Sequence, residues 1–238
     1  MTRRLELTWA DPRPFADGRE MIRILAASDE PDAALDHAAN RAAIGRVDLV
    51  VGCGDLSPDR VAFLGDAFHA PLVYVRGNHD HGRPWRAARN VPDETVGIDE
   101  RSLAGIRLLG LPWPGLDDVE ARGDNVTPRR ERAAWRQVAS ALKLRVVTGS
   151  DEPWIVFSHV PPEGAGDTPD DPFHAGFPAY RRVLDRLRPR LWLHGHTTRA
   201  SQRNPIVEHG PTTLVNVTGS FLVELRPDPA LLPPEEAG

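Results

Sequence analysis

The chain has 238 residues, of which 40% are hydrophobic, and its formal net charge is −5 at pH 7. This length suits one sizeable α/β domain, and no apolar run approaches the roughly 20 residues of a membrane span. The acidic balance disfavours a binding face for duplex nucleic acid. Cys53 is the only cysteine, which excludes an internal disulfide and favours a cytoplasmic location.

The first half of the chain alternates apolar runs with helical patterns. Residues 1–20 combine a short apolar start with proline and glycine, so we predict an N-terminal arm or an edge hairpin there. Three compact apolar runs then predict buried strands, at 21–27, 47–51 and 72–75. Between them, apolar residues recur at helical spacing from Leu35 and again after Ser57-Pro58, a good helix start.

The second half continues the alternation after a less regular stretch. Helices are expected from Thr127 and around Tyr180, and 161–176, rich in proline, glycine and aspartate, is expected to be a long loop. Further strands are expected at 96–98, 102–103, 106–111, 154–157, 191–193, 213–217 and 221–225. We therefore predict one α/β domain over 21–226 with largely parallel strands, followed by a flexible tail over 227–238.

Five of the predicted strands end in a short polar motif. The motifs are Asp29, Gly54-Asp55, Gly77-Asn78-His79-Asp80, Ser158-His159 and Gly195-His196. In open α/β sheets, ligands bind outside the carboxyl ends of the strands, so these side chains can converge on one site. Their oxygen and nitrogen donors suit a divalent metal such as Mn, Fe or Zn.

In order and spacing, these motifs resemble the signature of calcineurin-like metallophosphoesterases: Asp-x-His, Gly-Asp, Gly-Asn-His-Asp/Glu, His and Gly-His-x-His. The resemblance covers about residues 21–225 and implies a four-layer α-β-β-α sandwich of two mixed sheets, with two metals at the strand ends. It implies a set of metal ligands in which Asp55 bridges the two ions: Asp29, Asp55, Asn78, His159 and His196. It further implies hydrolysis of a phosphomonoester or phosphodiester by metal-activated water. His79 is then the expected general acid, with Asp80 orienting its ring.

The chain departs from this signature at two positions that both serve the first metal in the family. Pro31 stands in place of the first histidine, and Thr198 in place of the last. We favour the alternative in which one tightly bound ion remains, on the ligands of the second site. In the other alternative the first site persists as a weaker oxygen site that favours Mn or Mg, on Asp29, Asp55 and water, with help from Glu30.

The same losses leave a second function open, a non-catalytic descendant that binds a phosphate-bearing ligand and regulates a partner. Retention of His79 and Asp80 favours the enzyme, because a binding fold needs no acid for a leaving group. The sequence carries no signal for a particular oligomeric state.

Four more side chains are predicted to face a small phosphate-bearing substrate: Arg76, His81, Arg83 and His174. The two arginines flank the expected phosphate position and could hold it bidentately, with an ordinary surface ion pair as an equal alternative. His174 lies in 161–176, which we expect to be a lid over the site. Trp113, between two prolines, is a candidate for an exposed ring that stacks on a base.

Overall fold

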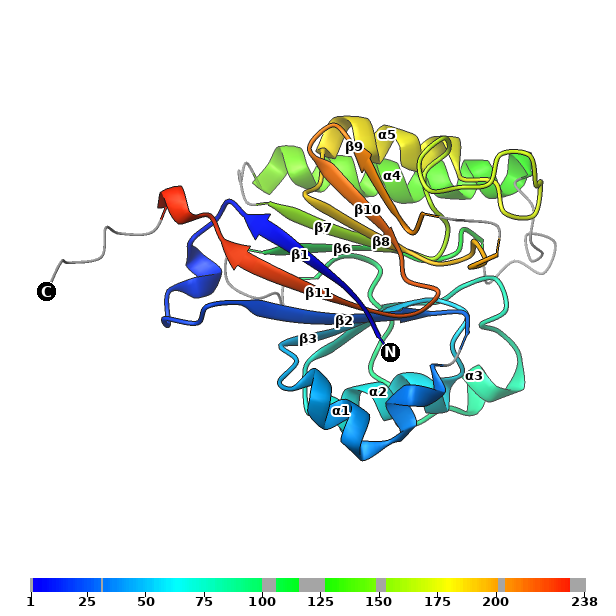
Figure 1. Cartoon of the computed structure of the whole chain (residues 1–238). Coiled ribbons are helices and arrows are strands. Elements are labelled where there is room, and N and C mark those ends of the chain that lie inside the picture. Colours follow the sequence, from blue (N-terminus) through cyan, green and yellow to red (C-terminus); the bar gives the residue numbers. More distant parts are fainter. Residues whose placement is uncertain are drawn as a thin grey trace, which may run out of the picture.

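Two sheets facing each other form the centre of the molecule, with helices on both outer sides (Figure 1). The computed structural model describes residues 2–30, 32–99, 106–115, 127–148, 153–200 and 204–231. Both sheets mix parallel and antiparallel pairs, so the predicted four-layer α-β-β-α sandwich is confirmed. No helix within these ranges has the length and apolar character needed to cross a membrane.

The first sheet has five strands in the order β1-β11-β2-β3-β4. They are β1 (Arg3–Trp9), β2 (Ile22–Ser28), β3 (Leu49–Cys53), β4 (Leu72–Val75) and β11 (Gly219–Pro227). β2, β3 and β4 run parallel because helical crossovers return the chain between them. The crossovers are η2 (Ala33–Asp36) with α1 (Ala38–Ile44), and α2 (Pro58–Phe68), which Ser57 caps as its Ser-Pro start predicts.

The second sheet has six strands in the order β5-β6-β7-β8-β10-β9, with antiparallel pairs at its two edges. They are β5 (Gly97–Asp99), β6 (Arg107–Leu111), β7 (Trp154–Ser158), β8 (Leu191–His194), β9 (Ile206–His209) and β10 (Thr212–Asn216). α4 (Pro128–Thr148) and α5 (Pro178–Leu187) cover its outer face, while the short α3 (Arg83–Ala87) lies beside the first sheet (Figure 1).

Strand β2 shows how the layers are built from the sequence. Ile24 and Ala26 face the second sheet and join the central core, whereas Leu25 and Ala27 face the helices. Alternate side chains of a strand point to opposite faces, and both faces of β2 are covered. The sequence of this strand is therefore a nearly continuous run of apolar residues.

Strand β1 is the main difference from the predicted topology. It pairs in parallel with β11, from Arg3 opposite Phe221 to Trp9 opposite Pro227, and Trp9 is fully buried. The segment 1–20 is thus joined to the sheet and is neither an arm nor a hairpin. Parallel pairing with a strand far away in sequence leaves no local signal. Strand β9 and helix α3 were also not predicted, and 102–103 and 232–238 lie outside the described residues.

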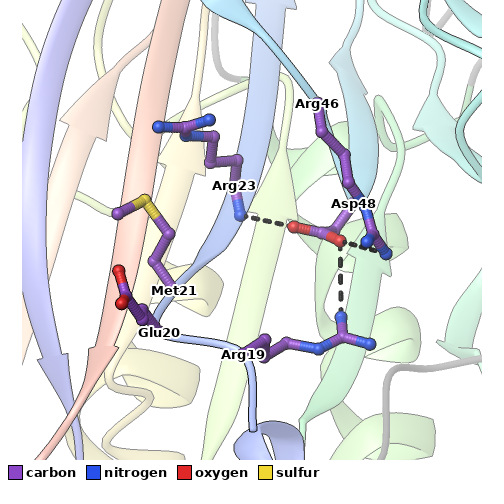
Figure 2. Close-up of a pocket in the computed structure, with 6 residues that line it drawn as sticks. All are labelled: Arg19, Glu20, Met21, Arg23, Arg46 and Asp48. Carbon is purple, nitrogen blue, oxygen red and sulfur yellow. Dashed lines mark hydrogen bonds and ion pairs between the residues drawn. The ribbon is translucent and has the colours of Figure 1, made fainter. Parts of the chain in front are cut away.

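A polar cluster holds the opposite end of the first sheet, where β2 and β3 begin (Figure 2). The Asp48 carboxylate accepts a hydrogen bond from the Arg23 backbone N–H at 3.0 Å and pairs with Arg19 at 3.3 Å and Arg46 at 3.0 Å. These residues, with Glu20 and Met21, line a cavity of about 330 Å³. Because its carboxylate is engaged by these arginines, we interpret the cluster as structural.

Replacing Asp48 tests this interpretation. Asp48→Ala removes a 7%-exposed carboxylate and with it the hydrogen bond from the Arg23 N–H and the pairs with Arg19 and Arg46. The free energy of unfolding should therefore fall by about 1.5–3 kcal/mol, as for lost hydrogen bonds to charged groups. Thermal unfolding measures the change. Glu20→Ala, in the same cavity, is the control and should stay within about 0.5 kcal/mol of the unmodified protein. Equal midpoints for the two variants would contradict the anchoring role.

Candidate metal centre

The carboxyl ends of strands from both sheets meet at one edge of the sandwich. Five of these strands are each followed within three residues by one of the predicted ligands: Asp29 after β2, Asp55 after β3, Asn78 after β4, His159 after β7 and His196 after β8. Within the described residues, one carboxylate oxygen each of Asp29 and Asp55 and a ring nitrogen of His159 lie within 4.8 Å of one another. The structure therefore brings side chains from all five predicted motifs to one place.

The His159 ring is the centre of this arrangement. Its Nδ1–H donates to the Cys53 carbonyl oxygen at 2.9 Å, so Nε2 is the nitrogen that faces the site. This Nε2 lies 2.8 Å from Asn78 Oδ1, 3.4 Å from Asp55 Oδ2 and 3.2 Å from His196 Nδ1. A lone pair facing two acceptor oxygens is repulsive unless a cation or a proton lies between them. A carbonyl that fixes the tautomer is typical of metal-binding histidines.

The electrostatics of the site favour added positive charge. Burial acts to lower the pKa of His159, but the carboxylates of Asp55 and Asp29 outweigh it and raise that pKa. Burial raises the pKa of Asp29, and the charge of Asp55 adds to the rise. Burial also holds the pKa of His196 well below its usual value, so this ring is neutral, as a metal ligand must be. The donor set therefore fits a divalent cation.

Three of these residues have left-handed backbone conformations. The φ angles are 55° at Asp29, 54° at Asp55 and 66° at His196, each directly beyond the end of a strand. Such conformations cost about 1–3 kcal/mol for non-glycine residues and cluster at functional sites. The sharp turns aim the side chains across the sheet edge instead of along the strand.

Asp29 is held by hydrogen bonds from three strand ends. Its Oδ2 accepts from the Ser28 hydroxyl, from the His196 backbone N–H at 3.0 Å and from the Thr218 hydroxyl at 3.3 Å. Ser28 and Thr218 are not predicted from the sequence, because single hydroxyl residues carry no motif. Their only signal is that each lies at a strand end, where the structure joins them by an isolated bridge.

The motif glycines make room for ligands of neighbouring motifs. A Cβ on Gly77 would lie 2.2 Å from Asp55 Oδ1, and one on Gly195 would lie 1.8 Å from Ser28 Oγ and 2.4 Å from Asp29 Oδ2. A side chain at either position would displace an aspartate from the site.

The altered first site is only partly described. Pro31 lies outside the described residues, and Thr198 is exposed and lines the site cavity. Glu30 pairs with Arg199 at 3.5 Å, and Arg199 also donates to the Thr218 carbonyl at 3.0 Å. The carboxylate of Glu30 is therefore engaged by a cation of the protein, which does not favour a role for Glu30 in a weak first metal site.

Asp80 differs from its prediction. Its buried carboxylate accepts hydrogen bonds from the backbone N–H groups of Asp55 at 2.6 Å and Gly77 at 2.9 Å, and from the Trp85 indole at 3.2 Å. Burial raises its pKa to about 7, and the charge of Asp55 contributes. Asp80 thus stabilises the turn that carries Asp55. Its described contacts are with these donors and not with the His79 ring, so the prediction that Asp80 orients that ring is not confirmed.

The His79 ring lies at the mouth of the site. Its backbone N–H donates to Asp55 Oδ1 at 3.0 Å, and its side chain is 68% exposed. It lines a cavity of about 430 Å³ together with Asp29, Asp55, Asn78, Phe173, His174, His196 and Thr198. The segment 161–176 therefore supplies two walls of the cavity, Phe173 and His174.

The other predicted substrate-facing residues do not line this cavity. Arg76 Nε lies 2.7 Å from Glu94 Oε2, and the guanidinium covers the Trp85 ring, so the surface ion pair replaces the predicted phosphate contact. His81 and Arg83 are exposed and lie outside the described cavity lining.

Trp113 is also placed differently from its prediction. It is only 2% exposed and packs against the site histidines, with its ring 5.4 Å from that of His196 and 6.1 Å from that of His159. It therefore supports the metal ligands from within the core and offers no exposed ring.

Comparison with known proteins agrees with the fold described above. Residues 22–199 match the sequence model described as calcineurin-like phosphoesterase. A dimetal phosphatase from Danio rerio superposes with a TM-score of 0.55 at 15% identity, covering 84% of this chain and 88% of that chain. The protein TT1561 from Thermus thermophilus gives 0.52 at 16% identity, covering 84% and 90%. Phosphopantetheinyl hydrolase from Mycobacterium tuberculosis gives 0.50 at 15% identity, covering 90% and 99%. No significant match was found among curated protein sequences.

The close approach at Gly77 yields a direct test of the site. Gly77→Ala must displace Asp55, so we expect loss of most bound divalent metal and a destabilisation of about 1–3 kcal/mol from overpacking. Gly65→Ala is the control: in α2 the new Cβ meets nothing nearer than 3.4 Å, and alanine suits a helix better. Metal analysis and thermal unfolding report both effects. Unchanged metal content in Gly77→Ala would contradict the role given to Asp55.

Proposed function

The chain belongs to the calcineurin-like phosphoesterase family, and from this we propose that it hydrolyses a phosphomonoester or phosphodiester using one tightly bound divalent ion. The observation that supports this best is the convergence of Asn78 Oδ1, Asp55 Oδ2 and His196 Nδ1 on Nε2 of His159. These four residues would hold the ion, and their mixed donors suit Mn, Fe or Zn, with manganese the first to try. A bound ion of this kind polarises a phosphoryl oxygen and makes a water molecule more acidic.

His79 is proposed as the general acid. Its ring is exposed at the cavity mouth, while its backbone N–H is fixed by Asp55, so the ring can approach a leaving oxygen without disturbing the ligands. Imidazole is the side chain best suited to exchange a proton near neutral pH. His79 would donate that proton to the departing alcohol.

Asp29 would orient the attacking water. One of its oxygens is occupied by three donors, and the carboxylate lies close to Asp55 and His159. A carboxylate fixed in this way can accept a hydrogen bond from water facing the phosphorus. The proposed substrate is a small phosphate-bearing molecule. The buried free thiol of Cys53 agrees with a cytoplasmic setting.

Thr198 favours a second candidate, a non-catalytic protein that binds a phosphate-bearing ligand. Thr198 lines the cavity at a position where the family has a histidine that binds metal. This replacement removes one ligand of the two-metal site. Such a protein would keep the ion and the phosphate site but would not turn over. We rank it second because His79 faces the same cavity.

Metal content and hydrolysis, measured together, separate these functions. We expect one tightly bound divalent ion per chain, and hydrolysis of p-nitrophenyl phosphate or bis(p-nitrophenyl) phosphate that chelation abolishes. His196→Ala should lose most of the metal and about 100-fold or more in rate, since the ion contributes several kcal/mol at the transition state. His209→Ala, which loses only the pair with Asp185, should change neither. A metal-bearing protein without hydrolysis would favour the binding function, and an unaffected His196→Ala would refute the proposed site.

Restoring a lost ligand type tests whether the first metal site has been replaced. We expect Thr198→His to leave the metal content at one ion and turnover unchanged or lower, because Phe173 and His174 line the same cavity and Glu30 is paired with Arg199. Metal analysis and steady-state rates report the outcome. A second bound ion with faster hydrolysis would instead show that the first metal site lacks only its ligands and that no other groups have replaced it.

A further inference from the structure

Two rings from one loop form a wall of the site cavity. They are His174 and Phe173, neighbours within the segment 161–176. Phe173 is 55% exposed, and among the large apolar side chains exposed in the described residues it is the one that lines the cavity. The other two, Val96 and Trp135, lie outside the cavity lining. The exposed phenyl ring is therefore placed beside the reacting groups.

A single carboxylate holds the ring of His174 and the backbone of Phe173. Asp171 Oδ1 accepts the Phe173 backbone N–H at 2.9 Å, and Asp171 Oδ2 accepts from His174 Nδ1 at 2.6 Å. The His174 backbone N–H also donates to the Asp171 carbonyl at 3.0 Å. The loop is tied further by Thr168 N–H to the His174 carbonyl at 3.1 Å and by Gly176 N–H to Asp167 Oδ2 at 3.0 Å. Rings held in place before a ligand arrives lose little freedom on binding it.

The position of His174 indicates contact with the substrate. Its ring lies 5.4 Å from that of His196. His174 is not one of the four residues proposed to hold the ion, and it lines the same cavity. A phosphoryl oxygen bound in the cavity can therefore lie between His174 and the ion. Because Nδ1 donates to Asp171, Nε2 is the nitrogen left for a ligand. A phosphoryl oxygen only accepts, so this contact requires the imidazolium form of His174, with a proton on Nε2 as well.

Phe173 adds an apolar surface to a cavity whose other described walls are carboxylates, an amide, histidines and a threonine. A short alkyl alcohol would leave the phenyl ring without a partner. A flat ring on the alcohol could stack on it, which is worth roughly 2- to 10-fold in affinity. The volume of about 430 Å³ falls within the usual range for a small-molecule site.

We propose that the 168–176 loop selects phosphoesters whose alcohol carries a flat ring, with His174 bonded to a phosphoryl oxygen and Phe173 stacked on that ring. Nucleotides are the nearest simple class with this chemistry. This inference rests on the hydrolytic function proposed above. Asp171 is the positioning residue for both contacts.

Two substrates with the same leaving alkoxide test the proposal: adenosine 5′-phosphate and ribose 5-phosphate, or their methyl phosphodiesters if diesters are the preferred class. The unmodified protein should show a kcat/KM several-fold higher for the adenosine compound. Phe173→Leu should bring that ratio close to one, mainly through KM, and Phe173→Tyr should restore it. Trp135→Leu, which removes another exposed ring, should keep the ratio of the unmodified protein.

Variants of His174 and Asp171 test the other two contacts of the proposal separately. His174→Gln should lower kcat/KM for both compounds by about 10-fold. Asp171→Ala should raise KM for both and reduce the ratio, with the thermal midpoint preserved. A protein that hydrolyses p-nitrophenyl esters yet treats the pair equally, or hydrolyses neither, overturns the ring-recognition proposal and leaves the hydrolytic function standing. A protein that hydrolyses no ester overturns both.

Discussion

The hydrogen bond from His159 Nδ1–H to the Cys53 carbonyl is the contact on which the site depends. It joins the end of β7 in one sheet to the end of β3 in the other, and it decides which ring nitrogen faces the cavity. With Nε2 facing the cavity, the oxygens of Asn78 and Asp55 can lie this close to it at low cost only if a proton or a metal cation joins them. The arrangement therefore suits the binding of a cation.

The directions of the strands in the sandwich, and the turns that follow them, make this convergence possible. Parallel strands in both sheets bring their carboxyl ends to one edge, and left-handed turns at Asp29, Asp55 and His196 direct the side chains across it. The strain of these turns is offset by hydrogen bonds between motifs, such as the His196 N–H to Asp29 and the Asp55 N–H to Asp80. The opposite end of the first sheet is held by ion pairs around Asp48.

Much of this could be predicted from the sequence, because each ligand follows an apolar run whose direction in a parallel sheet is known. The strand-end motifs therefore indicated the fold class, the family and the group of converging side chains. The directions of individual side chains could not be predicted. Asp80 and Arg76 turn toward local donors and acceptors, Gly77 N–H and Glu94, that only the folded loops bring near. Ser28 and Thr218 act through their place at strand ends, which composition does not mark.

The most direct test is crystallographic. Crystals grown with Mn²⁺ would be measured near the manganese absorption edge, and an anomalous difference map would locate the ion without reference to activity. The account predicts one strong peak bonded to His159 Nε2, with Asn78, His196 and Asp55 as the remaining protein ligands. A map without a peak there, with His159 still in direct contact with Asn78, would contradict it, as would an ion bound elsewhere on the chain.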